Sequence, residues 1–84
     1  MRKREYRDYL NDISESIDDA LSFVEGMTFK DFKKDKKTIY AVVRSIEIIG
    51  EASGKVPKRV RDKAPDVPWV EMKGMRNKIA HEYF

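Results

Sequence analysis

The sequence of 84 residues predicts an all-α fold, an up-and-down bundle of four to five helices in which two long helices run antiparallel. Three observations predict it. Apolar residues recur at intervals of three and four along most of the chain, which is the spacing of one helix face. No segment alternates apolar and polar residues as a strand would, and the three prolines lie at or near the ends of the periodic segments. At this length we expect residues 1–84 to form a single domain.

The first predicted element is a long amphipathic helix that begins near Tyr6. Gly26 is placed to terminate it, because the residue just past a helix end often takes a left-handed conformation. A further turn is expected from Thr28 to Phe32, with Thr28 as its cap and Asp31 three residues later. The apolar stripe of the long helix consists of Tyr6, Leu10, Ile13, Ile17, Ala20, Leu21 and Val24.

A second long helix is expected after the lysine-rich stretch, with Asp35 as its N-cap. Gly50 falls in the middle of its apolar stripe, where a glycine costs about 1 kcal/mol relative to alanine. Two interpretations stay open at this point: another backbone approaches closely at Gly50, or the glycine is a tolerated defect. The stripe consists of Ile39, Val42, Val43, Ile46, Ile49 and Ser53.

Prolines delimit a short third helix, since Pro57 suits a first turn and Pro65 ends the segment. Asp66 and Pro68 then open the last helix, which runs from about Trp69 into the end of the sequence. On an ideal helix of about 100° per residue, one face of this element is apolar and is expected to be buried. That face comprises Trp69, Met72, Ile79, Ala80 and Tyr83.

Arg76 lies in the centre of the same face. Because burying an unpaired guanidinium costs several kcal/mol, Arg76 requires a carboxylate partner, a route to the surface along its stem, or an anion in a cavity. Glu47 and Glu51, on the flank of the second long helix, are the candidate carboxylates.

His81, the only histidine, lies about 140° around the last helix from Arg76. Asn77 stands one turn earlier on the histidine's side, and Gly74 two turns earlier. Close packing is expected at Gly74, as at Gly50, and its missing side chain would leave an open floor beside the imidazole. Arg76, Asn77 and His81 would then border a cleft. The alternative is an ordinary histidine at a helix end, and spacing alone does not decide between the two.

Composition limits how such a small domain can be stabilised. A chain of this size buries only about 60% of its unfolded surface, and its sequence has no cysteine and a single histidine. Disulfides are therefore excluded, no metal site is predicted, and association into a homodimer is the expected route to stability. No apolar run approaches the roughly 20 residues of a membrane span. The charged start MRKREYRDYL lacks the apolar core of a signal peptide, so a cytoplasmic protein without membrane contact is expected.

Positive residues are clumped although the net charge is only +3. Such clumps favour a polyanionic partner, while solvated helix faces are the alternative. A basic DNA-binding domain is poorly supported, because no helix-turn-helix pattern is present. The three clumps are Arg2, Lys3, Arg4 and Arg7; Lys30, Lys33, Lys34, Lys36 and Lys37; and Lys55, Lys58, Arg59, Arg61 and Lys63.

The segment RNKIAHEY, residues 76–83, resembles the Arg-x4-His-x-Tyr signature of HepT-like proteins, the HEPN-domain toxins. The similarity extends back to Ile46 through IEIIGEASGKVPKRVRDKAPDVPWVEMKGMRNKIAHEYF, with its Ile-Gly-Glu-Ala core, Pro-Trp helix entry and Gly-Met-Arg-Asn stretch. The resemblance implies a bundle of the HEPN type. Relatives typically continue past the Tyr-Phe pair into a further C-terminal helix, so this domain is expected to lack that helix and to expose apolar surface.

The resemblance also implies a metal-independent endoribonuclease whose cleft forms where two protomers meet. RNA carries its own nucleophile, the 2′-hydroxyl. The roles implied are proton transfer for His81, phosphate binding for Arg76, and orientation of the phosphate or the imidazole for Asn77. The RNA would be a tRNA or an mRNA, and no cofactor is implied.

Regulation by a partner is a further implication of the resemblance. Family members pair with nucleotidyltransferase antitoxins of the MNT type, which transfer AMP from ATP to the motif tyrosine, here Tyr83. In that role ATP serves only as the AMP donor for the partner. Simple packing of Tyr83 on the apolar stripe is the alternative. The alternative hypothesis for the whole chain is a catalytically inactive HEPN adaptor that binds a partner or a nucleotide.

Overall fold

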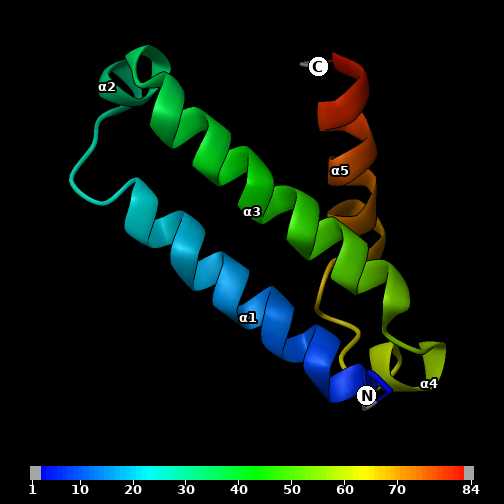
Figure 1. Ribbon diagram of the computed structural model, residues 1–84. Coiled ribbons are helices and arrows are strands. Elements are labelled where there is room, and N and C mark those ends of the chain that lie inside the picture. The colour runs from blue at the N-terminus through cyan, green and yellow to red at the C-terminus, as the bar shows by residue number, and fades with distance from the viewer. Residues whose placement is uncertain (1–2, 83–84) are drawn as a thin grey trace.

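Five helices make up the regular structure in a computed structural model, which describes residues 3–82 apart from the side chains of Ala80 and Glu82 (Figure 1). Within these residues no strand occurs. The all-α prediction is therefore confirmed, with the helix number at the upper end of the expected range. The helices are α1 (Tyr6–Phe23), α2 (Phe29–Lys34), α3 (Lys36–Lys55), α4 (Lys58–Arg61) and α5 (Trp69–Glu82).

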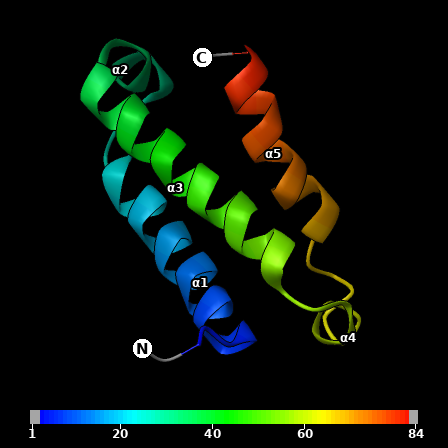
Figure 2. The ribbon, with the colours of Figure 1, turned by 45° about the vertical axis from the view of Figure 1, so that its right-hand side comes forward.

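Helices α1 and α3 are the long antiparallel pair that the sequence predicted, and they lie side by side in both views (Figures 1 and 2). Their apolar stripes meet in a small core near the start of α1 and the end of α3. Burial of this apolar surface is the main force that holds the pair together. The buried apolar residues are Ile13, Ile49, Ala52 and Val56, and Tyr9, Leu10, Val60, Trp69 and Met72 pack against them.

Helix α3 is central, because α1 packs on one side of it and α5 on the other (Figure 2). Its buried residues are mostly small: Ser45, Ile49, Gly50, Ala52 and Ser53. The two serine hydroxyls donate to carbonyls one turn earlier, Ser53 to Ile49 at 2.6 Å and Ser45 to Ala41 at 3.2 Å. The polar groups of the buried face are thus satisfied within α3 itself, so the neighbouring helices can pack on it without supplying hydrogen-bond partners.

Local signals at the helix ends act as the sequence predicted. Gly26 has a φ of +75°, the left-handed conformation that ends the turn after α1. The Thr28 hydroxyl accepts the Asp31 N–H at 3.0 Å, and the Asp31 carboxylate accepts the Thr28 N–H at 3.1 Å, which forms a capping box at α2. At the start of α3, the Asp35 carboxylate accepts the Thr38 N–H at 3.1 Å.

The Asp35 cap is charge-dependent, because hydrogen bonds from Thr38 hold the pKa of this carboxyl below its ordinary value. Because its pKa is lowered in the folded state, the Asp35 carboxylate stabilises the fold fully at any pH above the ordinary carboxyl pKa. The contribution is lost as the pH falls through the lowered value. The start of α3 is therefore fully capped at neutral pH.

The segment between α3 and α5 contains fewer helical residues than its prolines predicted. Pro57 was expected in the first turn but is the N-cap of α4, and α4 ends at Arg61, before Pro65 is reached. Turns follow, and the indole Nε1 of Trp69 donates to the carbonyl of Ala64 at 3.0 Å. This bond ties the first residue of α5 to the turn that precedes it.

The chain is extended for its length. The radius of gyration is 14.1 Å, against about 12 Å for a compact domain of this size. Helix α5 diverges from α3 toward its C-terminal end in both views (Figures 1 and 2). None of the described helices is long and apolar enough to cross a membrane.

Candidate functional site

The site begins where α5 crosses α3 at Gly50. A Cβ atom placed on Gly50 would lie 2.7 Å from the Cβ of Arg76 and 3.0 Å from the carbonyl oxygen of Met72. Both atoms belong to the rigid part of α5, so no side chain fits between the helices at this point. Of the two interpretations of Gly50, close approach by another backbone is confirmed. The crossing fixes the position from which the Arg76 side chain leaves α5.

Arg76 itself is exposed, although the sequence placed it at the centre of a buried face. The reason is that α5 packs almost entirely on α3, so a large part of its circumference faces solvent. Of the three outcomes expected for the guanidinium, the carboxylate partner is not observed: within the described residues neither Glu47 nor Glu51 forms an ion pair with Arg76. The stem instead reaches the surface from the crossing.

A hollow of about 220 Å³ lies beside the crossing and is lined from both helices. It is lined by Arg76 and Asn77 and adds two lysines that the motif does not contain. Glu51 lines it as well, whereas Glu47 does not. With three cations against one carboxylate, the hollow suits an anion such as a phosphate group. Its main lining residues are Gly50, Glu51, Lys55, Lys73, Arg76 and Asn77.

Of the two additional lysines, the sequence could have identified only one. Lys55 belongs to the third basic clump, but its position at the end of α3 gives no hint that it faces α5. Lys73 precedes Arg76 by one helical turn, and i, i+3 neighbours share a face. That spacing is the signal that could have identified Lys73.

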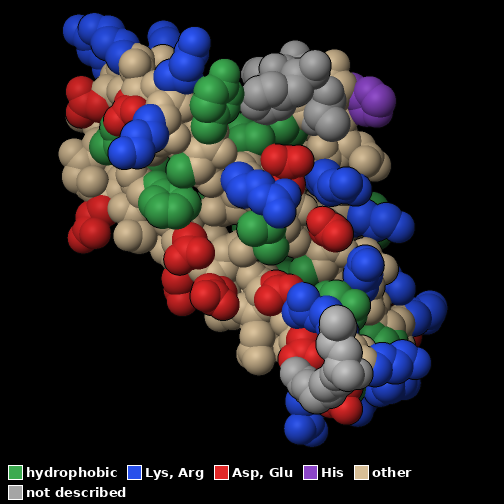
Figure 3. All heavy atoms as spheres, viewed as in Figure 1, with side chains coloured by type: hydrophobic (Ala, Val, Ile, Leu, Met, Phe, Trp, Pro, Cys, Tyr) green, Lys and Arg blue, Asp and Glu red, His purple; other side chains and the backbone are tan. Residues whose placement is uncertain are grey.

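His81 is exposed and does not line the hollow of Arg76. The imidazole, the purple side chain in Figure 3, stands at the outer edge of the molecule. At Gly74, two turns earlier, a Cβ atom would meet no other atom of the described residues within 4 Å, so the close packing expected there is not found among them. The surface of α5 at Gly74, on the side of the histidine, is therefore open, as expected from the missing side chain.

A second hollow, of about 320 Å³, covers this side of α5. Asn77 and Lys73 line both hollows, so they connect the Arg76 side of α5 to the Gly74 side. Arg61 and Trp69 contribute a further cation and an aromatic ring. In the described residues of one chain, α5 therefore carries a cationic edge that suits an anion. The imidazole of His81 lies further along the helix and does not close this edge into a cleft. Tyr83 lies outside the described residues.

Comparison with known proteins gives a consistent result. A family model described as "Ribonuclease HepT-like" matches residues 13–84. A Methanocaldococcus jannaschii protein whose name describes it as a proposed RNase is 45% identical over 84 residues, which is 100% of this chain and 69% of that protein. A Thermococcus cleftensis protein named "Probable ribonuclease HepT" is 48% identical over 82 residues, 98% of this chain and 74% of that protein. No solved structure is significantly similar.

Proposed function

Because this chain belongs to the HepT-like ribonuclease family, we propose that it is an endoribonuclease that needs no metal ion and uses the 2′-hydroxyl of its RNA substrate as the nucleophile. The observation that carries the proposal is the hollow at the α3–α5 crossing, where Arg76 lines a cationic surface without a carboxylate partner among the described residues. An exposed guanidinium in such surroundings is suited to hold a phosphodiester in bidentate fashion.

The proposed reaction divides the work among three side chains. The 2′-oxygen attacks the adjacent phosphorus, its proton passes to an imidazole, and the bond to the 5′-oxygen breaks as that oxygen takes up a proton. Arg76 binds the phosphate and stabilises the charge that develops on it. His81 transfers the protons. Asn77, which lines the hollows on both sides of α5, orients the phosphate or the imidazole.

A second protomer would complete the cleft. One chain supplies one imidazole, while the reaction uses both a base and an acid, and a two-fold axis would bring a second His81 to the same phosphate. An exposed apolar residue supports association: Val70 is 77% exposed on the face of α5 that also carries Gly74, Asn77 and His81. A helix from a second copy could approach closely over Gly74.

The proposed substrate is a tRNA or an mRNA, which the enzyme would meet in the cytoplasm. The test is incubation of the purified protein with end-labelled RNA, with and without EDTA. We expect cleavage in both, with products that end in a 2′,3′-cyclic phosphate, because no metal-bound water takes part. Loss of cleavage in EDTA, or products with a free 3′-hydroxyl, would contradict the proposed chemistry.

Regulation by an MNT-type nucleotidyltransferase is the finer part of the proposal, in which this chain acts as the toxin of a toxin–antitoxin pair. The phenol oxygen of Tyr83 would attack the α-phosphate of ATP, releasing pyrophosphate and leaving AMP on the tyrosine. An added phosphate next to the motif would repel the RNA backbone. Intact-mass measurement after incubation with the partner and ATP should show the adenylyl increment. A Tyr83→Phe variant should not show it, and an increment on that variant would assign the modification elsewhere.

The rival function, a catalytically inactive HEPN adaptor, has one observation in its favour. Among the described residues, His81 does not line the hollow that Arg76 lines, so a protein that stays monomeric would lack a complete site. The cleavage assay separates the two functions, because an adaptor leaves the labelled RNA intact under all conditions.

A further inference from the structure

Two basic segments that are far apart in the sequence meet at one end of the molecule. Arg7 at the start of α1 and Arg59 in α4 are 52 positions apart, yet both line one hollow of about 610 Å³ around Tyr6. Lys63 is close enough for its charge to act on the Tyr6 phenol. We call this group the N-terminal basic cluster; it consists of Lys3, Arg4, Arg7, Arg59 and Lys63.

Two arginines of the cluster, Arg7 and Arg59, lie over an aromatic ring and are not neutralised by carboxylates among the described residues. The guanidinium carbons of Arg59 and Arg7 lie 5.4 Å and 5.9 Å from the ring centre of Tyr6. Neither arginine forms an ion pair within the described residues, and Glu5 is the only carboxylate among the described residues that line the hollow. The hydrogen bond from Arg7, together with the charges of Arg7, Arg59 and Lys63, lowers the pKa of Tyr6, which reports a positive local potential.

The cluster connects to the candidate site through Lys55. Lys55 lines the hollow of Arg76, and its amine also lies 5.8 Å from the ring centre of Tyr9. The guanidinium carbon of Arg4 lies 4.7 Å from the centre of the same ring, and Arg4 lines the hollow of the N-terminal basic cluster. A chain of adjoining cationic surfaces therefore leads from Arg76 past Lys55 and Tyr9 to Tyr6. Figure 3 shows Lys and Arg side chains following the edge of the molecule between the α4 end and the histidine.

The middle of this path, at Arg4, Tyr9 and Lys55, also borders acidic residues. A hollow between α1 and α3 contains Asp12, Glu15 and Asp19 in addition to Arg4 and Lys55. Asp12 also holds Arg4 in an ion pair at 2.7 Å, so Arg4 is partly neutralised. A polyanion would be repelled from the middle of α1 and attracted to the ring-stacked arginines. Arg7 and Arg59 are thus the residues best placed to bind it.

We propose that the N-terminal basic cluster is a second RNA-binding surface, which holds backbone phosphates of a single strand whose scissile phosphate lies at Arg76. The inference rests on the proposed ribonuclease function. A guanidinium placed over a tyrosine ring keeps its N–H groups available for a phosphate. The cluster binds RNA and takes no part in the bond-breaking step.

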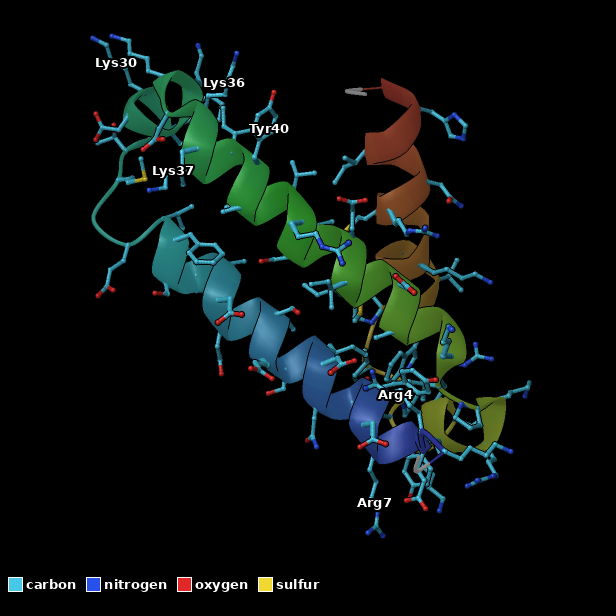
Figure 4. The ribbon with its side chains drawn as sticks, viewed as in Figure 1. Arg4, Arg7, Lys30, Lys36, Lys37 and Tyr40 are labelled. Atoms are coloured by element: carbon cyan, nitrogen blue, oxygen red, sulfur yellow. The ribbon has the colours of Figure 1, made fainter. Side chains whose placement is uncertain are left out.

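The test compares two variants with the same change in charge. In Arg7→Gln/Arg59→Gln the cluster loses two cations. In the control, Lys30→Gln/Lys37→Gln, two exposed lysines are removed at the opposite end of the molecule, where Figure 4 labels them away from Arg4 and Arg7. KM and kcat are measured for a long single-stranded RNA and for a dinucleotide that only the Arg76 site can hold. The salt dependence of RNA affinity is measured by fluorescence anisotropy.

For the cluster variant we expect KM for the long RNA to rise about tenfold near 0.15 M salt, and the slope of log affinity against log salt to fall by about 1.4, the value for two phosphate contacts on a single strand. Its kcat for the long RNA and its rate on the dinucleotide should stay unchanged. The control variant should change KM less than about twofold. An unchanged KM in the cluster variant, or an equal rise in both variants, would overturn the proposal.

Two further outcomes are distinguishable. If the wild-type protein cleaves neither substrate, the ribonuclease function fails, and the anisotropy slopes still decide whether the cluster binds RNA. If the cluster variant binds and cleaves RNA normally but no longer binds its nucleotidyltransferase partner, the surface recognises a protein and the RNA proposal is rejected.

Discussion

Replacement of His81 by alanine is expected to lower kcat for RNA cleavage by about 10²–10⁴-fold, the usual contribution of a positioned proton-transfer group. The fold should be unaffected, because His81 is exposed near the end of α5; the unfolding temperature should shift by less than about 3 °C. Single-turnover cleavage of labelled RNA measures the first effect, and thermal denaturation followed by circular dichroism measures the second. Undiminished cleavage by the variant would remove His81 from the mechanism.

The second prediction with a large expected effect is that Arg76→Ala lowers kcat for RNA cleavage, measured in the same single-turnover assay. Loss of an electrostatic contact to the reacting phosphate typically costs about 10²–10³ in kcat. Lys78→Ala is the matched control, since Lys78 is an exposed cation two residues along the same helix. If Lys78→Ala and Arg76→Ala reduce cleavage equally, the effect is one of general charge and Arg76 has no special role.

The His81 variant also tests whether the cleft is shared between protomers. If each cleft contains both histidines, mixed dimers are inactive, and in an equal, fully exchanged mixture only about one quarter of the dimers are wild type. Activity should then be about half of that of the same amount of wild-type protein diluted with buffer. An activity equal to the buffer-diluted sample would mean that each protomer works alone.

Replacement of Gly50 by alanine should destabilise the protein by about 1–3 kcal/mol, the cost of overpacking a tight contact. For a domain of this size that corresponds to a fall in unfolding temperature of roughly 10 °C. The added methyl group would lie 2.7 Å from the Cβ of Arg76 and 3.0 Å from a backbone oxygen, so α5 must move away from α3. Because this motion displaces Arg76, cleavage should fall as well, even at temperatures where the variant is folded.

Gly54→Ala is the control for Gly50→Ala. The two glycines lie one turn apart on α3, but a Cβ on Gly54 would meet only the flexible side chain of Lys73, at 3.5 Å. Helix propensity should then dominate, stabilising the protein by about 1 kcal/mol. Thermal denaturation, followed by the fluorescence of Trp69 at the start of α5, should give shifts of opposite sign. Shifts of the same sign would mean that the crossing at Gly50 is looser than its geometry indicates.

Those parts of the fold that depend on neighbouring residues were predictable from sequence. The caps at Thr28 and Asp35 and the turn at Gly26 each require a particular residue at a particular place, and all three are present in the structure. Gly50 was predictable only in part: a glycine inside a helix is unfavourable by itself, which left a close contact or a tolerated defect as explanations, and the crossing with α5 decides for the contact.

Features that depend on which helices meet were less accessible. Burial of Arg76 was inferred from helix periodicity, which gives the angle of a residue on its own helix and not the number of helices around it. Because α5 packs mainly on α3, the angle overestimates burial. The convergence of Arg7 and Arg59 on Tyr6 could not be predicted either, since it follows from the way α4 folds back toward the start of α1. Whether Arg76, Asn77 and His81 act as proposed stays a prediction.

The buried face of α3 has a consequence for how this sequence can vary. Ser45, Gly50, Ala52 and Ser53 are small, and no large side chain in the described residues is fully buried. Most cores lose stability chiefly when bulky residues are truncated; here the central helix has little volume to lose. Selection at these positions should therefore act mainly against larger side chains, because the two serines and Ala52 have only one or two side-chain heavy atoms to lose and Gly50 has none.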